Sequence, residues 1–178
     1  MTAVEQTDTT DNSTDVEPTI RAANRGDEHA VVELYNWYIA NTVITFEEQP
    51  LDADAMAERM FNGDASCPWF VLEIEGVLLG YAYAGMWKSR AAYRSSRETS
   101  IYLHRDAAGK GYGSLLYRHL LNEMRKTTVH LLIAGIALPN SASVALHESL
   151  GFKPVGQFNE VGRKFGQWVD VGYWQLAL

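Results

Sequence analysis

The sequence predicts a mixed α/β (α+β) fold, formed as one domain around a central mixed sheet flanked by helices. Strand-type patterns and helical spacings of apolar residues both occur along the chain, but they do not alternate strictly as in a Rossmann fold. The chain has 178 residues, of which 47% are hydrophobic, which is enough for one well-buried domain and short for two. We therefore expect one domain, at residues 18–178.

The first half of this domain is predicted to form strands and helices in turn. An Asp precedes each of two segments with helical spacing of apolar residues, and Asp is a favoured N-cap. Glu75-Gly76 separates two apolar stretches, which is a hairpin signal. The predicted elements are a strand at 19–23, a helix from Asp27 to about Asn41, a helix from Asp52 to just before Gly63, and strands at 69–74 and 77–87.

The second half is predicted to add two helices and four strands. The run 130–136 is continuously apolar, as in a central strand covered on both faces. Gly151 follows a short helical pattern and is a typical C-terminal stop. The predicted elements are a strand at 98–103, a helix at about 112–126, a strand at 130–136, a helix capped by Asn140 or Ser141 and ending at Leu150, and strands at 152–158 and 167–178.

Composition limits the classes of function. Residues 1–17 are rich in Thr, Asp and Glu with almost no large apolar side chain, so we expect a mobile acidic tail. The net charge is −7, and there is no basic excess of the kind that nucleic-acid binding needs. Cys67 is the single cysteine, which excludes an internal disulfide and a Cys-based zinc site. No signal peptide or membrane-spanning run is present, so we expect a cytoplasmic protein.

The most informative motif is a glycine-rich turn between a strand and a helix. Gly109, Gly111 and Gly113 follow the strand at 98–103 and lead directly into the helix near residue 112. Glycines at such a junction let backbone N–H groups converge at the positive end of a helix, which suits a phosphate or pyrophosphate. The spacing fits neither a Rossmann nor a Walker motif, and a purely structural turn remains the alternative.

Four segments together resemble the GNAT superfamily of N-acetyltransferases, in its branch of phosphinothricin and methionine sulfone or sulfoximine N-acetyltransferases. The turn at 108–113 resembles the pyrophosphate-binding motif of that superfamily. The resemblance covers roughly residues 19–178 and implies the single-domain acyl-CoA N-acyltransferase fold, with a splayed central sheet. The other three matching segments are Ala82-Tyr-Ala-Gly-Met-Trp-Lys-Ser-Arg-Ala-Ala-Tyr93, Leu138-Pro-Asn-Ser-Ala-Ser-Val-Ala-Leu-His-Glu-Ser-Leu-Gly-Phe152 and Val161-Gly-Arg-Lys-Phe-Gly-Gln-Trp-Val-Asp-Val-Gly-Tyr-Trp-Gln175.

The resemblance implies that the co-substrate is acetyl-CoA and that no metal takes part. Backbone groups of one strand would bind the pantetheine arm, N–H groups of the turn and helix start would bind the pyrophosphate, and Asn140 would lie near the thiol. Ala108 replaces the family's usual Arg or Gln, so that side-chain contact is missing. The implied cofactor-binding residues are Ile101, Tyr102, Leu103, Gly109, Lys110, Gly111, Tyr112, Gly113, Ser114 and Asn140.

Two residues are implied in catalysis. Only a free amine attacks a thioester, so a base must remove a proton from the ammonium group, and Glu98 matches the family's acid. A surface glutamate at a strand start is the alternative. His147 occupies a helix position where many GNAT enzymes carry a Tyr that is thought to protonate the leaving thiolate. Imidazole could serve as acid or base there, or it could simply pack beneath the cofactor.

The acceptor-side residues follow from the same resemblance. Phe46 lies in a segment like the family's substrate-side loop, although a core aromatic is the alternative. Lys88, Arg90 and Tyr93 precede Glu98, and the guanidinium group of Arg suits a carboxylate, phosphinate or sulfone. Trp168, Tyr173 and Trp174 are expected in the core or in the interface of a homodimer, which is common among similar proteins.

The predicted function is acetyl-CoA-dependent acetylation of the α-amino group of a small amino acid or analogue, by direct transfer in a ternary complex. A backbone N–H of residues 101–103 would bind the oxyanion. One alternative is an N-acetyltransferase of a peptide N-terminus or polyamine, which an open, acidic acceptor groove would favour. The other is a non-catalytic acyl-CoA-binding module, because a fold does not fix a function. Partners other than a small molecule and a second copy, such as nucleic acid or membrane, are not expected.

Overall fold

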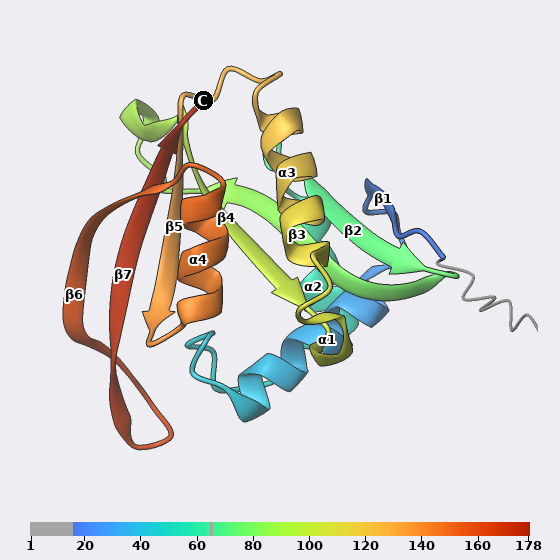
Figure 1. Cartoon of the computed structure of the whole chain (residues 1–178), viewed down its shortest axis with the longest axis horizontal. Coiled ribbons are helices and arrows are strands. Elements are labelled where there is room, and N and C mark those ends of the chain that lie inside the picture. The colour runs from blue at the N-terminus through green and yellow to red at the C-terminus, as the bar shows by residue number, and fades with distance from the viewer. Residues whose placement is uncertain (1–15, 65) are drawn as a thin grey trace, which may run out of the picture.

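The computed structural model describes residues 16–64 and 66–178. Most of the predicted acidic tail, at residues 1–17, lies outside these residues, and Val16 and Glu17 within them are exposed. Within these residues, seven strands and four α-helices form one α+β domain around a single sheet (Figure 1). In the part of the chain that the structure describes, none of the helices is long and apolar enough to cross a membrane.

The sheet has the strand order β1-β2-β3-β4-β5-β7-β6. All neighbouring strands are antiparallel except β4 and β5, which are parallel. Parallel strands need a long crossover connection, and here the helix α3, Tyr112–Met124, supplies it. The strands are β1 Thr19–Ala22, β2 Trp69–Ile74, β3 Val77–Met86, β4 Ser96–Leu103, β5 Leu131–Leu138, β6 Lys153–Lys164 and β7 Gln167–Ala177.

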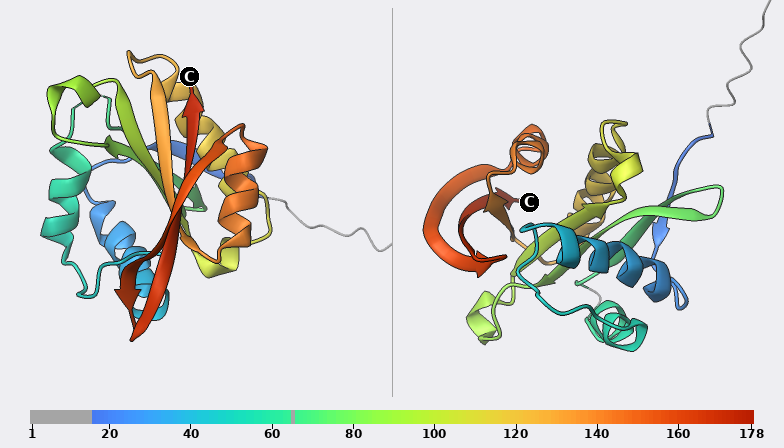
Figure 2. Two further views of the ribbon diagram at one scale, coloured as in Figure 1. Left: turned by 90° about the vertical axis from the view of Figure 1, so that its left-hand side faces the viewer. Right: turned by 90° about the horizontal axis from the view of Figure 1, so that it is seen from below.

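Helices cover both faces of the sheet, as the two turned views in Figure 2 show. On one face, α1 (Glu28–Asn41) and α2 (Ala53–Phe61) pack on β2 and β3 through a cluster that includes Val31, Met56 and Tyr81. On the other face, α3 and α4 (Ser141–Ser149) pack through a larger cluster that includes Leu116 and Leu132. Burying one apolar stripe per helix against each face explains why these amphipathic segments are helical.

β4 and β5 separate along their length, and we call this separation the splay. Their pairing runs from Ser96 opposite Leu131 to Glu98 opposite Ile133 and then stops. Beyond Glu98, β4 pairs with β3 alone, while β5 continues to pair with β7 as far as Leu138. The splayed sheet that the family resemblance implied is therefore confirmed.

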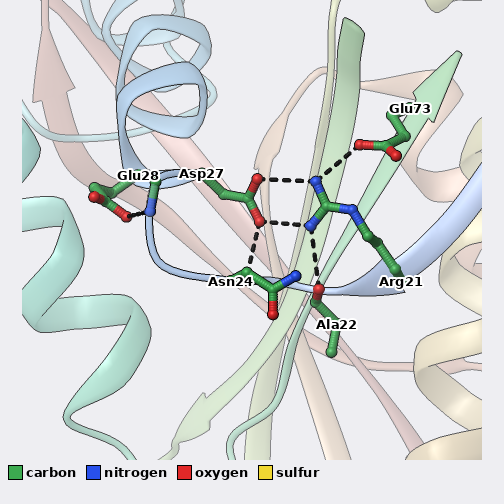
Figure 3. Close-up of polar contacts among 7 residues, drawn as sticks. Arg21, Ala22, Asn24, Asp27, Glu28 and Glu73 are labelled. Carbon is green, nitrogen blue, oxygen red and sulfur yellow. Dashed lines mark hydrogen bonds and ion pairs between the residues drawn. The ribbon is translucent and has the colours of Figure 1, made fainter. Parts of the chain in front are cut away.

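The predicted elements are confirmed with small shifts, and Asp27 is the instructive exception. Asp27 stands at the N-cap position of α1, but its carboxylate makes no capping hydrogen bond. It instead accepts hydrogen bonds of 2.7 and 3.0 Å from Arg21, which also binds Glu73 on β2 (Figure 3). The Arg21 guanidinium lowers the pKa of Asp27, so the side chain ties β1 to the helix start rather than capping it.

The remaining differences lie at element ends. β6 runs to Lys164, six residues beyond its predicted end, and contains an irregularity in its pairing between Phe158 and Gly162. α3 ends at Met124, and the predicted strand at 98–103 begins at Ser96. Two short 3₁₀ helices, η1 at Ala91–Tyr93 and η2 at Arg105–Ala107, have no counterpart in the predicted elements.

Candidate active site

Two adjoining cavities follow the splay between β4 and β5. The outer one, of about 360 Å³, lies at the glycine-rich turn and is lined by Gly109, Gly111 and Gly113. The inner one, of about 50 Å³, lies between Thr99–Tyr102 of β4 and Gly135–Ala137 of β5, and His147 lines it from α4. The residues lining both cavities are Ile44, Ile101, Asn140 and Ser143.

The glycine-rich turn has the geometry of a backbone anion cradle. Gly109 and Gly111 have φ angles of 75° and 79°, in the left-handed region that glycine adopts without strain. Gly111 is the N-cap of α3, and no side chain caps the first turn. The first N–H groups of the helix have no intrahelical partner and are therefore available to a ligand. Gly113 is buried, and a Cβ there would lie 3.2 Å from Leu103. The turn fits a pyrophosphate that lies against backbone.

The other residues predicted to bind the cofactor lie around the same cavities. Tyr112 and Ser114 are half-buried in the first turn of α3, and Lys110 is exposed beside them. Asn140 caps α4, its side-chain oxygen accepting a 3.1 Å hydrogen bond from the Ser143 N–H. The Leu103 carbonyl is occupied, because the Tyr38 hydroxyl donates to it at 2.7 Å. The predicted pantetheine contacts of residues 101–103 stay a prediction, and Ile101 and Leu103 line the outer cavity.

Glu98 lies where the splay begins, with a half-buried side chain. Thr99 faces α3, so alternation along β4 directs Glu98 to the face that carries α1 and α2. Its carboxylate lies beside β5, because a Cβ on Gly135 would be 3.6 Å from Oε1. Among the described residues the carboxylate has no hydrogen-bond or ion-pair partner. Burial raises the pKa of Glu98, and the charge of Lys88 opposes this increase.

His147 is buried, with only 3% of its surface exposed, and both of its ring nitrogens have partners. Nδ1 lies 2.7 Å from the Ser143 carbonyl, which can only accept, so Nδ1 carries the hydrogen. Nε2 lies 3.1 Å from the Tyr117 hydroxyl, which in turn lies 2.6 Å from Thr99 Oγ1. Burial lowers the pKa of His147, so the ring is neutral near pH 7. This geometry favours the packing alternative over a freely titrating acid or base.

Tyr173 lies beside Glu98, because a Cβ on Gly135 would be 3.2 Å from the Tyr173 ring and 3.6 Å from Glu98 Oε1, and two further aromatic rings contact Tyr173. Tyr173 on β7 makes edge-to-face contacts with Trp87, at 5.9 Å between ring centroids, and with Phe158, at 5.8 Å. Burial, followed by the charge of Glu98, raises the pKa of Tyr173. Tyr173 is thus a wall of the site, Trp174 belongs to the core, and Trp168 is 60% exposed.

The four predicted acceptor-side residues are not all brought together. Lys88 acts electrostatically on Glu98, and its Nζ lies 4.7 Å from the centroid of the Trp87 ring. Arg90 and Tyr93 are exposed on the connection from β3 to β4, and neither side chain has a polar partner among the described residues. Phe46 is 40% exposed, so it is not a core residue, and its ring lies over the backbone of Gly162.

Sequence patterns did not reveal that Thr99, Tyr117 and Tyr173 lie at the site. Tyr117 lies on the apolar face of α3, so its position in the sequence predicts a core residue, and it is indeed buried. Its role in the chain of hydrogen bonds depends on residues 18 and 30 positions away. In the described ranges, no group of three or more His, Cys, Asp or Glu side chains could hold a metal ion.

Comparison with known proteins identifies the architecture. Residues 20–172 match the acetyltransferase (GNAT) domain. The chain is 39% identical to a phosphinothricin N-acetyltransferase of Streptomyces viridochromogenes, over 88% of this chain and 85% of the relative. It is 38% identical to an L-methionine sulfoximine/L-methionine sulfone acetyltransferase of Salmonella typhimurium, over 90% and 94%. A phosphinothricin acetyltransferase from Sinorhizobium meliloti, solved with acetyl-CoA, superposes with a TM-score of 0.87 at 36% identity, covering 90% of this chain and 88% of that one.

Proposed function

The chain belongs to the GNAT acetyltransferase family, and from that premise we propose that it acetylates the α-amino group of a small amino acid or analogue. It is an acetyl-CoA-dependent N-acetyltransferase. We take the acceptor to be of the phosphinothricin, methionine sulfone or methionine sulfoximine type, which the names of two relatives support. The observation that carries the proposal is the half-buried carboxylate of Glu98 at the start of the splay, which has no polar partner within residues 16–64 and 66–178.

The reaction proceeds by direct transfer in a ternary complex. The glycine-rich turn holds the pyrophosphate, and the splayed ends of β4 and β5 receive the pantetheine arm and the thioester. The amine attacks the carbonyl carbon, so a C–N bond forms and the C–S bond breaks. A backbone N–H of residues 101–103, freed by the splay, stabilises the oxyanion. The electron pair of the broken bond leaves on sulfur as a thiolate, which then takes up a proton.

Glu98 removes the proton that the attacking amine must lose. A carboxylate with an ordinary pKa is a weak base near neutral pH, and the raised pKa of Glu98 makes proton transfer more favourable. Ionised Glu98 also attracts the ammonium group of the acceptor before transfer. The charge of Lys88 favours the ionised carboxylate and so opposes the effect of burial on the pKa of Glu98.

His147 acts as a positioning residue in this scheme. Its neutral ring holds the Tyr117 hydroxyl, and Tyr117 holds Thr99, the residue next to Glu98 on β4. Because His147 also lines the inner cavity, it shapes the floor beneath the thioester. The proton that the thiolate takes up comes from solvent or from the acceptor, since both ring nitrogens of His147 are engaged.

Arg90 and Lys88 select an anionic acceptor. Arg90 is exposed and has no polar partner among the described residues, so its guanidinium is available to a carboxylate or phosphinate. Phe46, Tyr93 and Tyr173 would contact the body of the acceptor. This arrangement disfavours a polyamine, whose positive charges would meet two cationic side chains.

We also propose that the enzyme is a cytoplasmic homodimer. β6 is an edge strand of the sheet, and the β6–β7 hairpin exposes an apolar surface. A second copy of the chain could pack on this surface. A cytoplasmic location follows from the multiply charged co-substrate, which does not cross a bilayer unaided. The large apolar residues of this hairpin surface, all at least 54% exposed, are Val155, Phe158, Val161, Phe165 and Trp168.

The proposal is tested by release of free CoA thiol with a panel of acceptors. The panel contains phosphinothricin, methionine sulfone, methionine sulfoximine, ordinary amino acids, polyamines and a short peptide. We expect fast release with the analogues alone. Release with polyamines or the peptide alone would keep the transferase activity and overturn the anionic acceptor. No release with any acceptor, despite acetyl-CoA binding, would support a binding module.

A further inference from the structure

Lys164 is a buried cation that the proposed mechanism does not use. It lies at the end of β6, beside the Phe165-Gly166 turn, and only 2% of it is exposed. Its Nζ donates a 2.7 Å hydrogen bond to the carbonyl of Thr45, 119 positions earlier in the chain. Within the described ranges, no carboxylate lies within 4.0 Å of it. Burial of an ammonium group without an ion pair is costly and also lowers the pKa of Lys164.

The segment that Lys164 holds forms a wall of the site. Ile44, on one side of Thr45, lines both cavities of the splay. Phe46, on the other side, lies over Gly162 of β6 so closely that a Cβ at position 162 would overlap the ring. Thr45 itself is buried, and its hydroxyl lies 2.7 Å from the Tyr35 hydroxyl of α1. Segment 44–46 is therefore fastened on one side to α1 and on the other to β6.

The Lys164 contact is the polar half of the β6 attachment. Because Nζ binds the backbone of Thr45 and not its side chain, the hydrogen bond fixes the main chain of the segment directly. Lys164 does not line the cavities described above, so it acts on substrates through segment 44–46 and not by touching them. A buried ammonium group that is held by a hydrogen bond to a distant backbone carbonyl fits a role in fixing one conformation.

We propose that Lys164 is a positioning residue that fixes segment 44–46 as the wall between the splay cavities and the β6–β7 hairpin, and so sets the acceptor pocket. The consequence for substrates rests on the proposed function, in which Phe46 contacts the acceptor. The consequence for the segment itself does not, because it follows from the Thr45 and Phe46 contacts alone.

The first test measures the segment without any substrate. We compare Lys164→Met, which keeps length and loses the donor, with Lys164→Arg, which keeps charge and donors, and with Lys153→Met as a control. Lys153 is an exposed lysine at the opposite end of the same strand. We expect hydrogen exchange at residues 42–48 to rise about tenfold in Lys164→Met, less in Lys164→Arg and not at all in Lys153→Met. Unchanged exchange in Lys164→Met would overturn the proposal.

The second test is a double-mutant cycle with Phe46→Ala, read in steady-state kinetics. Lys164→Met should raise the acceptor KM about tenfold, because acceptor binding must then supply the free energy that orders segment 44–46, which is about that of one hydrogen bond to a charged group. The acetyl-CoA KM should stay within about threefold, because the glycine-rich turn is untouched. In the Phe46→Ala background, adding Lys164→Met should raise the acceptor KM little further. Additive effects, or equal increases in both KM values, would contradict action through Phe46.

The two proposals fail in different ways. If the wild-type enzyme acetylates none of the amino acids or analogues, the proposed function is wrong, while the exchange experiment still decides the role of Lys164. If the wild-type enzyme is active but Lys164→Met neither loosens residues 42–48 nor changes the acceptor KM, the proposed function survives and the role of Lys164 is wrong.

Discussion

In the proposed mechanism, Glu98 serves catalysis at the expense of stability. Burial raises its pKa, which means that folding favours the neutral acid over the carboxylate. Burying the ionised carboxylate lowers the free energy of unfolding, and this destabilisation is fully present above the folded-state pKa. It disappears below the unfolded value of about 4.3, where the group is protonated in both states.

Glu98→Gln should therefore raise the melting temperature at pH 8 and leave it unchanged at pH 4. The amide has the shape of the carboxylate without its charge, so packing around Gly135 is preserved. Thermal unfolding of the two proteins at both pH values checks this prediction. A variant less stable than wild type at pH 8 would mean that the carboxylate has a stabilising partner.

Tyr117 offers a second test at this scale, because it separates positioning from proton transfer in the chain that includes His147. Tyr117→Phe removes the hydroxyl between His147 and Thr99 but keeps the buried ring. We expect a loss of about 1–3 kcal/mol in the free energy of unfolding, from unpaired buried groups, and less than about tenfold in kcat. A loss of kcat greater than about a hundredfold at full folding would instead indicate proton transfer through this chain.

At the scale of elements, we propose that the glycine-rich turn makes α3 a binding site, because two left-handed residues lie at its N-terminus and line the outer cavity. Gly111→Ala places a Cβ in open space, so its cost is backbone strain at φ 79° and not a clash. We expect acetyl-CoA to bind at least about fivefold more weakly. Equilibrium binding of acetyl-CoA to the variant measures this.

Gly76→Ala is the matched control for that experiment. Gly76 has φ 78°, and a Cβ there also meets nothing within 4 Å, but it lies in the β2–β3 hairpin. Both variants should lose similar stability, while only Gly111→Ala should lose affinity. Equal affinity in both would show that the conformation of the turn does not matter for acetyl-CoA.

Patterns along the chain predicted most elements, because periodicity, Asp caps and Gly stops are local properties. What they missed involves residues far apart in sequence. Asp27 reads as a helix cap, but Arg21 on β1 takes its carboxylate. β6 continues past 158 because Glu160, with φ 52°, absorbs an irregularity in the pairing. Lys164 lies between the last two predicted strands, and only the fold brings it to Thr45.

The site shows the same division. The glycine-rich turn could be recognised from its residues, and the base from resemblance to a family. The burial of Glu98, the partners of His147 and the position of Tyr173 depend on how β4, β5 and β7 meet, which no single segment encodes. The prediction for Arg90 still depends on resemblance, since the structure gives its side chain no partner among the described residues.

At the scale of the whole molecule, the exposed apolar surface of the β6–β7 hairpin predicts a dimer. We expect light scattering after gel filtration to give about twice the monomer mass of 19.9 kDa. Trp168→Asp, which places a charge on that surface away from the core, should shift the mass to that of a monomer. A monomeric wild-type protein at micromolar concentration would contradict the proposed homodimer.

The central claim is that Glu98 is the base of an acetyl transfer, and the dependence of kcat/KM on pH in wild type and Glu98→Gln tests it most directly. Because the base works only when ionised and its pKa is raised, wild-type kcat/KM should fall with decreasing pH along a limb centred above 4.5. In Glu98→Gln the activity should be much lower and that limb absent, with acetyl-CoA affinity nearly unchanged. An identical limb in the variant would show that another group removes the proton.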